Sequence, residues 1–462
     1  MTSKNKQAKL QKNQEVEGEV IDITYEGLGV LKVDNFPIFV TDALPGELVK
    51  VGVTKVLNNY AFGRVIERIK TSPDRVENEH KEMISSGIAP LVNLKYDAQL
   101  AFKQNQIKEL FHKVGIDDVE ITETIGMDNP TQYRNKTVVP VKMQDGKLTT
   151  GFYRRGSHKL VPMGDYYLND PKIDAAVGVV RDILDKYKVS AYDETTREGT
   201  VRYVMIRRGY YSHQMMLVIV ATKIELPHEK EIIDEIHFAL PELRSLILNY
   251  NPKQTNVQLG LDNRTLFGED VIHDELLGLD FVISPNSFYQ VNPQTTEILY
   301  KKAADMAELD KNDTVIDAYS GIGTIGLTVA DRVKEVIGVE VVEPAVENAQ
   351  INKAANNIQN AEFIANDAPT QFIEWAKKGI KPDVVFVDPP RKGLTSELIQ
   401  SVGLMAPKKF VYVSCNPATL ARDAVELIEQ GYKITRPIVP IDQFPQTMHI
   451  ESITIFEKND EN

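Results

Sequence analysis

Cys415 is the only cysteine of the 462-residue chain, and its surroundings could support covalent chemistry. The preceding segment Val411-Tyr-Val-Ser reads as a buried strand, and Asn416-Pro417 ends that strand. We therefore expect the cysteine just beyond the carboxyl end of a strand, where open α/β sheets bind their ligands. A lone cysteine is most often a small buried hydrophobe. Whether Cys415 is a nucleophile depends on what the rest of the chain brings beside it.

A glycine-rich loop and an acidic residue follow two successive strands earlier in the chain. The loop Tyr319-Ser-Gly-Ile-Gly-Thr-Ile-Gly326 opens a helix, and its glycines allow the backbone to approach a ligand closely. Glu340 ends the next strand about 20 residues later, where an acid can bind both hydroxyls of a ribose. This spacing suits NAD or S-adenosyl-L-methionine and leaves both open.

Asp388-Pro-Pro follows the fourth strand and favours a methyltransferase, because dehydrogenases have no standard use for this motif there. It is compatible with methylation of an exocyclic amino group, a chemistry that needs no cysteine. Cys415 after the next strand points instead to the C5 carbon of a pyrimidine. Addition of a thiolate to C6 makes C5 nucleophilic, and a base must then remove the C5 proton before the thiolate leaves.

The elements that would position these residues form a doubly wound α/β sheet. Strands alternate with helical sequence after residue 285, which predicts a parallel sheet with helices on both faces. The expected strands are 313–317, 336–340, 362–365, 383–387, 410–413 and, at the C-terminus, 451–456.

The N-terminal part of the chain predicts a different architecture. Five short strands with turn residues between them indicate a small β-barrel of the OB type. A helix at 96–114 and a mixed α+β region follow. The expected domains are a disordered basic tail (1–13), an RNA-binding barrel (14–72), a central RNA-binding α/β domain (73–285) and the catalytic domain (286–462).

The net charge of −13 argues against a nucleic-acid partner, but the basic residues are clustered. The first cluster includes Arg134, Lys136, Arg154 and Arg155, and the second lies with several aromatic residues at 197–213. Cations that bind phosphate and rings that stack on bases suit RNA, although a solvated basic face explains the pattern equally well. A polar N-terminus and the absence of a long apolar run predict a cytoplasmic protein without a membrane partner.

Three segments of the chain resemble the signatures of RNA (uracil-5-)-methyltransferases. They are residues 388–393, 411–419 and 441–451, and residues 287–292 resemble the family's segment before the catalytic domain. The N-terminal barrel resembles the family's TRAM domain. The resemblance covers nearly the whole chain, and it implies a Rossmann-like class I domain that uses S-adenosyl-L-methionine to methylate uridine C5.

Carried over position by position, the resemblance implies that Cys415 is the nucleophile and Glu451 the base that removes the C5 proton. A thiolate is the attacking form, so we expect a depressed pKa for Cys415, with Arg391 and the Asn416 region as the candidate causes. The expected cofactor-binding residues are Gln290, Tyr319, Gly321, Gly323, Glu340, Asp367 and Asp388. The expected substrate-binding residues are Phe288, Gln290, Arg134, Lys136, Arg154 and Arg155.

One departure from the family pattern bears on the substrate. Many relatives hold an iron–sulfur cluster with four cysteines, whose places are taken here by His80, Ser86, Ala89 and Tyr166. The resemblance therefore implies a cluster-free bacterial member that flips out and methylates one or two uridines of 23S ribosomal RNA, with no obligate protein partner evident. The alternatives are the same chemistry on tRNA, whose enzymes are expected to lack the TRAM barrel, and a non-catalytic RNA-binding assembly factor.

Overall fold

The computed structural model describes residues 10–459, which form two compact units. The first unit contains the described chain up to Phe102 together with Tyr153–Val161 and Phe444–Met448, and the remaining residues form the second. The contacts thus separate two units rather than three domains, and the boundaries at 72 and 285 stay predictions. In the described range, no helix has both the length and the apolar character needed to cross a membrane.

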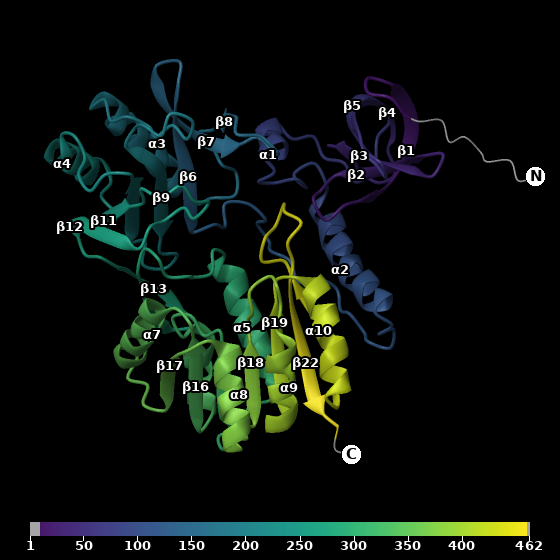
Figure 1. Cartoon of the computed structure of the whole chain (residues 1–462), viewed down its shortest axis with the longest axis vertical. Coiled ribbons are helices and arrows are strands. Elements are labelled where there is room, and N and C mark those ends of the chain that lie inside the picture. Colours follow the sequence, from purple (N-terminus) through teal and green to yellow (C-terminus); the bar gives the residue numbers. More distant parts are fainter. Residues whose placement is uncertain (1–9, 460–462) are drawn as a thin grey trace, which may run out of the picture. The chain divides into compact units, whose positions relative to one another are not determined.

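The first unit is built on a closed five-stranded barrel, which confirms the OB-like prediction (Figure 1). Alternate side chains such as Leu31, Ile38 and Val51 fill its interior. The strand order is β1-β2-β3-β5-β4, with β3 parallel to β5. The elements are β1 (Glu15–Ile23), β2 (Gly29–Val33), β3 (Phe36–Thr41), β4 (Leu48–Val56), β5 (Ala61–Lys70), α1 (Lys81–Ser86) and the start of α2 (Tyr96–Lys113).

The ordered barrel begins before residue 14, where the predicted tail was expected to end. Leu10 packs against the barrel core, and the backbone N–H of Asn13 donates to the carbonyl of Val53 (2.8 Å). Residues 10–13 therefore belong to the barrel, because they share its core and its hydrogen bonds. The rest of the predicted tail, residues 1–9, lies outside the described residues.

A seven-stranded sheet forms the middle of the chain, with the order β12-β11-β10-β9-β6-β7-β8. Its central strands are buried on both faces: every residue of β10 is apolar and buried, and all of β9 except Tyr203 is buried. The elements are β6 (Lys136–Gln144), β7 (Lys147–Tyr153), β8 (Leu160–Pro162), α3 (Pro171–Lys186), β9 (Val201–Arg208), β10 (Met215–Ala221), α4 (Glu229–Ala239), β11 (Leu243–Tyr250) and β12 (Asp262–Gly268).

The C-terminal part carries the predicted doubly wound sheet, preceded by a hairpin of β13 and β14. The strand order is β17-β16-β15-β18-β19-β22-β20, and β21 also pairs with β22. The elements up to β17 are β13 (Ile272–Leu276), β14 (Leu279–Ile283), α5 (Pro293–Ala307), β15 (Thr314–Ala318), α6 (Thr324–Val329), a 3-10 helix (Ala330–Arg332), β16 (Glu335–Glu340), α7 (Glu343–Ala355) and β17 (Ala361–Ala365). The elements after it are α8 (Ala368–Lys378), β18 (Val384–Val387), α9 (Ser396–Met405), β19 (Lys409–Ser414), α10 (Pro417–Glu429), β20 (Tyr432–Ile434), β21 (Val439–Ile441) and β22 (Glu451–Lys458).

Both faces of this sheet are buried, because alternate residues of each strand enter two different cores. On β19, Val411 and Val413 join the core with α5, α6 and α7, whereas Phe410 and Tyr412 join the core with α8, α9 and α10. Figure 1 shows helices in front of the parallel strands and β22 beside β19. Five strands run parallel, and β22 runs antiparallel to β19. The first residues of β22 therefore lie at the carboxyl edge of the parallel strands.

Candidate active site

The antiparallel pairing of β19 and β22 brings Cys415 and Glu451 to the same edge of the sheet. The register pairs Val413 with Ile453 and Ser414 with Ser452, so Cys415 and Glu451 follow as the next position. Asn416 caps α10 with its side chain, which accepts from Ala418 N–H (3.1 Å) and turns the chain directly after the cysteine. The predicted nucleophile and the predicted base are thus neighbours in space.

The expectation of a depressed pKa for Cys415 was wrong for the free protein. Burial, and then the charges of Glu451 and Asp388, raise the pKa of the Cys415 thiol to about 12. Arg391 acts in the opposite direction, as the sequence suggested. The thiol is therefore protonated at neutral pH in the free protein, because burial disfavours the thiolate and the nearby carboxyl groups add to that effect more than Arg391 offsets.

Glu451 and Asp388 are buried carboxyl groups that favour their protonated forms. Glu451 is only 3% exposed, and burial together with the charge of Asp388 raises its pKa well above the ordinary value. One of its oxygens, Oε2, has no hydrogen-bond partner among the described residues. Burial raises the pKa of Asp388 to about 7. A carboxyl group with a raised pKa is a stronger base once it is ionised.

Arg391 is the cation of this group, and its side chain and backbone both contact site residues. Its Nη2 donates toward the ring of His449 (3.1 Å to Nε2), and its carbonyl accepts from Asn416 Nδ2 (2.8 Å). Although the His449 ring reaches the surface, partial burial and the charges of Arg391, Lys103 and Arg134 lower its pKa to about 4. His449 is therefore a neutral imidazole at pH 7.

The glycine-rich loop is shaped for a close approach at the same edge of the sheet. Tyr319, Gly321 and Gly323 have positive φ values of 65°, 55° and 85°. A positive φ is costly for a tyrosine, which indicates a backbone held in place by its surroundings. The two oxygens of Glu340 accept from the N–H groups of Gly321 (3.0 Å) and Val342 (2.8 Å), so the carboxylate lies against the loop. Its binding of a ribose stays a prediction.

Gln290 reaches this edge from the segment before α5. It is 7% exposed, its carbonyl accepts from Asn135 Nδ2 (3.0 Å), and its side chain hydrogen-bonds Tyr300. Tyr300 in turn contacts Thr324 Oγ1 (3.3 Å) after the glycine loop and feels the charge of Asp388. The packing of α5 therefore joins Gln290 to the loop and to Asp388.

The residues present fit S-adenosyl-L-methionine, whose ammonium and sulfonium groups are both positive. Burial and the charges of Asp388 and Glu340 raise the pKa of Asp317 to about 7, so three carboxyl groups share this edge and no cation contributes to the pKa of Asp317 within residues 10–459. The buried Ser320 Oγ has no hydrogen-bond partner in the described residues. Several acidic groups and a hydroxyl without a partner beside a glycine loop favour a cationic nucleoside.

Asp367 and Phe288, like Arg154 and Arg155, are predicted ligand-binding residues that lie on the surface. Asp367 is exposed and caps α8, where its Oδ2 accepts from Thr370 N–H (3.2 Å), yet its charge reaches Tyr319. Phe288 is 69% exposed, in a loop that is itself firmly held. The buried guanidinium of Arg207 donates to the carbonyls of Ser284 (3.2 Å) and Ser287 (2.9 Å) and so fixes the base of that loop.

Three of the four arginines of the second basic segment are buried and cannot form the RNA surface that the sequence suggested, whereas Arg197 is exposed. Arg202, Arg207 and Arg208 are 6%, 1% and 9% exposed. Arg202 donates to backbone carbonyls, among them that of Lys253 (2.8 Å), and Arg208 pairs with Asp170 and Glu242 (2.8 and 2.7 Å). These arginines are structural, because β9 lies in the interior of its sheet.

The first basic cluster is divided between the two units. Arg154 and Arg155 belong to the first unit, where Arg155 donates to the carbonyl of Glu26. Arg134 and Lys136 belong to the second, where Lys136 pairs with Arg207 across β6 and β9. In residues 10–459 no acidic side chain forms an ion pair with Lys136 or Arg207. Burial and the charges of Arg207 and Arg134 lower the pKa of Lys136 to about 7.

Sequence reasoning did not find the role of Arg207, because it grouped this arginine with the second basic segment. A buried cation without an acid is costly unless other groups solvate it. Arg207 is solvated by two loop carbonyls, and burial lowers its pKa to about 10. It therefore acts on the site through the loop that carries Phe288.

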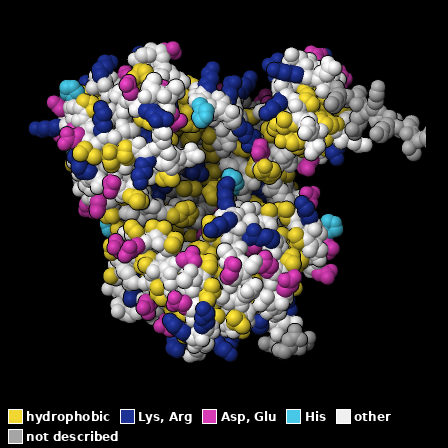
Figure 2. Space-filling model, viewed as in Figure 1, with side chains coloured by type: hydrophobic (Ala, Val, Ile, Leu, Met, Phe, Trp, Pro, Cys, Tyr) yellow, Lys and Arg dark blue, Asp and Glu magenta, His cyan; other side chains and the backbone are white. Residues whose placement is uncertain are grey.

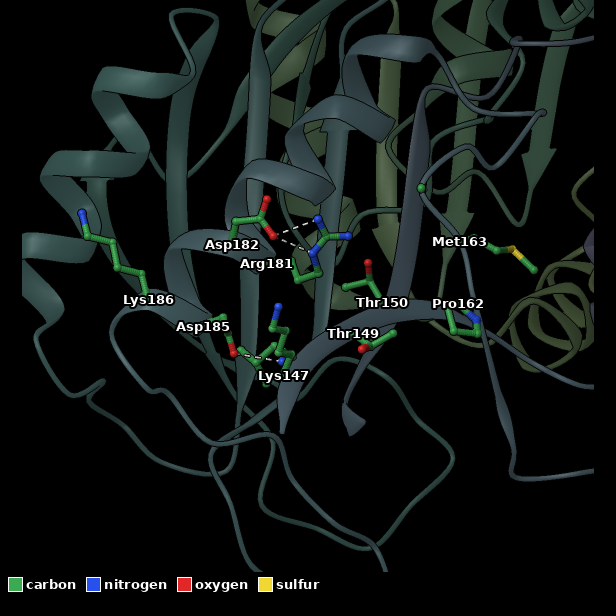
Figure 3. A pocket seen from close by; sticks show the side chains of 11 residues that line it. Lys147, Thr149, Thr150, Pro162, Met163, Arg181, Asp182, Asp185 and Lys186 are labelled. Carbon is green, nitrogen blue, oxygen red and sulfur yellow. Dashed lines mark hydrogen bonds and ion pairs between the residues drawn. The ribbon is translucent and has the colours of Figure 1, made fainter. Parts of the chain in front are cut away.

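A depression of about 700 Å³ lies beside β7 and α3, and none of the predicted catalytic residues lines it (Figure 3). Most of its charged side chains already have partners: Arg181 pairs with Asp182 (2.8 Å), and Asp185 accepts from Leu148 N–H (2.9 Å). Lys186 pairs with Glu235 (2.7 Å). We assign no role to it. Across residues 10–459, no group of three or more His, Cys, Asp or Glu side chains is placed to hold a metal ion.

Two family models match the chain. Residues 95–459 match the tRNA (Uracil-5-)-methyltransferase family, and residues 9–66 match the TRAM domain. An uncharacterized RNA methyltransferase of Lactiplantibacillus plantarum is 55% identical, over 95% of this chain and 96% of its own. One of Streptococcus mutans is 46% identical, over 97% and 100%.

A solved structure resembles the chain over almost its whole length. It is the Pyrococcus abyssi tRNA (uracil-54, C5)-methyltransferase in complex with S-adenosyl-L-homocysteine. The TM-score is 0.76 at 27% identity, covering 96% of this chain and all of that one. The alignment covers almost all of this chain, so this tRNA enzyme departs from the expectation that tRNA enzymes of this chemistry typically lack the barrel.

Proposed function

Because the chain belongs to the tRNA (uracil-5-)-methyltransferase family, we propose that it methylates C5 of one or two uridines in 23S ribosomal RNA. The observation that carries this proposal is the meeting of Cys415, Glu451 and Asp388 at one edge of the sheet. An enzyme that methylates amino groups would have no use for a cysteine there. We place the activity in the cytoplasm, where its RNA substrates are found.

S-adenosyl-L-methionine is the methyl donor, and its sulfonium supplies the methyl group as an electrophile. Glu340 and the loop at Gly321 would hold its ribose, while Asp388 and Gln290 would border its charged end. The raised pKa values of Asp317 and Asp388 support this arrangement, because a cationic ligand offsets the cost of ionising them.

In the proposed reaction Cys415 Sγ forms a bond to C6 of a flipped uracil, and the C5–C6 double bond supplies the electron pair with which C5 takes the methyl group. Glu451 then removes the C5 proton, the double bond re-forms, and the carbon–sulfur bond breaks. Cys415 must lose its proton before it attacks. Arg391 is the neighbouring cation that favours the thiolate.

The RNA would approach across the cations of the second unit. Arg134, Lys136 and Arg391 lie within electrostatic reach of one another or of His449. Between residues 10 and 459, Arg134 and Lys136 form no ion pair with an acidic side chain, and the nearby acid of Arg391 is the buried Glu451. Phosphate groups are the natural counterions for such a surface. Phe288 is exposed, two residues before Gln290 in the sequence. Its ring would stack on the flipped base, or on the neighbouring base that fills the gap left by the flipped one.

Methylation of tRNA is the second candidate, and the similarity to the Pyrococcus abyssi enzyme favours it. Both candidates are tested by mapping 5-methyluridine in ribosomal RNA and tRNA from cells with and without this gene, followed by complementation. Loss of the modification from 23S ribosomal RNA, restored by the wild type and not by Cys415→Ala, is the expected result. Loss of the modification from tRNA alone would identify tRNA as the substrate. A product methylated on nitrogen would contradict the proposed C5 reaction.

A further inference from the structure

Three aromatic rings lie together on the outer surface of the barrel. Phe39, Tyr60 and Phe62 are partly exposed, and their ring centroids are 5.2, 5.5 and 6.1 Å apart. Rings at such separations and with tilted planes form a contiguous aromatic patch. Figure 2 shows hydrophobic side chains grouped at the surface of the barrel.

The register of the strands explains why these rings point outward. Phe39 of β3 pairs with Phe62 of β5. Their neighbours Ile38, Val40 and Ala61 are fully buried in the barrel core. Side chains alternate along a strand, so Phe39 and Phe62 must lie on the other side of the sheet. The rings are therefore additional to the core that closes the barrel.

The charges around the rings are positive. Lys55 pairs with Phe62 across β4 and β5, Arg64 follows two residues after Phe62, and Lys32 lies on β2; all three are exposed. Among the described cross-strand partners of Phe39 and Phe62, and the residues two positions from either ring, none is acidic. Three exposed acids, Glu15, Glu17 and Glu19, lie together on β1, which pairs with neither β3 nor β5. The exposed acid of β5, Glu67, pairs with Lys50, farther along the strand than the pairing of Phe62 with Lys55.

We propose that the face formed by Phe39, Tyr60 and Phe62, flanked by Lys32, Lys55 and Arg64, binds single-stranded RNA by stacking bases on the rings. Aromatic rings bind any base through its π-face, and the flanking cations contact the phosphates. The glutamates of β1 would repel the RNA phosphates. The charge distribution therefore favours RNA binding at the ring face rather than on the β1 side. The inference rests on the proposed RNA substrate, and it assigns the nucleotides beside the target uridine to this face.

Tryptophan fluorescence tests this inference directly in the full-length chain. Tyr60→Trp introduces an indole into the patch, while the native Trp375 is buried in a helix-covered core and provides a constant background. Titration with a single-stranded oligouridylate should quench the introduced indole. The matched control is Tyr25→Trp, at an exposed turn of the same barrel outside the ring cluster, which should stay unquenched.

Affinity of the same oligonucleotide provides the second readout. Phe62→Leu keeps an apolar side chain and removes the ring, so affinity should fall about 5- to 150-fold, as expected for loss of base stacking. Thermal unfolding checks that this variant is folded, and the conservative Tyr60→Trp keeps the test valid if it is not. RNA that is bound and methylated without quenching, and with unchanged affinity of Phe62→Leu, overturns this inference and leaves the proposed function standing. If the wild type neither binds nor methylates RNA, both this inference and the proposed function are wrong.

Discussion

Glu451 lies at the next register position to Cys415 across β19 and β22, and its charge raises the pKa of the Cys415 thiol. The predicted base thus opposes ionisation of the predicted nucleophile in the free protein. Such a pair is unreactive until substrates change its surroundings. A resting state with a protonated thiol also protects the cysteine from oxidation, because the thiolate is the form that oxidants attack.

Replacement of Glu451 by glutamine should trap the reaction between the two steps assigned to these residues. Glu451→Gln retains the shape of the side chain and cannot take the C5 proton, so the methylated adduct with Cys415 should accumulate as an RNA–protein band that survives denaturation. Turnover should fall by about 10²- to 10⁴-fold, the usual contribution of a general base. Glu457→Gln, at the far end of the same strand, is the control and should turn over normally. Normal turnover of Glu451→Gln would assign the base elsewhere.

The thiol should react slowly with alkylating reagents at neutral pH. Since the chain has one cysteine, incorporation of iodoacetamide reports Cys415 alone. The pKa of about 12 predicts that the rate in the free protein keeps rising with pH beyond pH 9, where an ordinary cysteine has begun to level off. Glu451→Gln should shift this profile to lower pH, because it removes a repelling charge. A plateau below pH 8 would show a stabilised thiolate and contradict this expectation.

Asp388→Asn should stabilise the free protein more at pH 8 than at pH 5. The folded pKa of about 7 exceeds the unfolded value, so the folded state holds more protons between these pH values and the wild type loses stability as pH rises through that window. Asp388→Asn has no ionisable group at this position and does not lose this stability. The difference in unfolding free energy between variant and wild type should therefore be about 1–3 kcal/mol larger at pH 8 than at pH 5, since one pKa unit corresponds to roughly 1.4 kcal/mol. Asp367→Asn, at an exposed helix cap that asparagine also satisfies, should show no such trend.

Removal of the exposed ring of Phe288 should weaken the use of RNA and spare the methyl donor. Loss of one stacked base costs about 1–3 kcal/mol, so kcat/KM for RNA should fall by roughly 5- to 150-fold in Phe288→Ala. Binding of S-adenosyl-L-homocysteine, followed by calorimetry, should not change. Phe238→Ala is the matched control, because Phe238 is 90% exposed on α4. If Phe288→Ala and Phe238→Ala change kcat/KM for RNA equally, Phe288 does not contact the RNA.

Lys136 should contribute a phosphate contact that is present only while its ammonium is protonated. RNA affinity of the wild type should decrease as pH rises above about 7, where the lysine loses its charge. Lys136→Gln should lack this pH dependence, and its salt slope should be smaller by about 0.7, the value of one phosphate contact on single-stranded RNA. Lys172→Gln, an exposed lysine at the start of α3, is the control. If wild type and Lys136→Gln show the same salt dependence of RNA affinity, Lys136 contacts no phosphate and has a structural role.

The sequence by itself determined the local elements and the kinds of chemistry available. Alternating strands and helices after residue 285 specified the doubly wound sheet, and five short alternating strands specified the barrel. The positions of Cys415, Asp388 and the glycine loop after successive strands were enough to place them at one edge, because parallel strands share a carboxyl edge. These predictions succeeded because strand periodicity and turn residues are local properties of the chain.

Only the tertiary structure decided which of those residues are neighbours and in what ionisation state. Without the family resemblance, Glu451 read as an exposed acid on an edge strand, yet β22 inserts antiparallel between β19 and β20 and buries it beside Cys415. The sequence suggested an RNA surface at Arg202, Arg207 and Arg208. In the structure β9 is an interior strand, and all three side chains are buried. A pKa is set by burial and by charges from segments distant in sequence, so the protonated thiol of Cys415 could be known only from the fold.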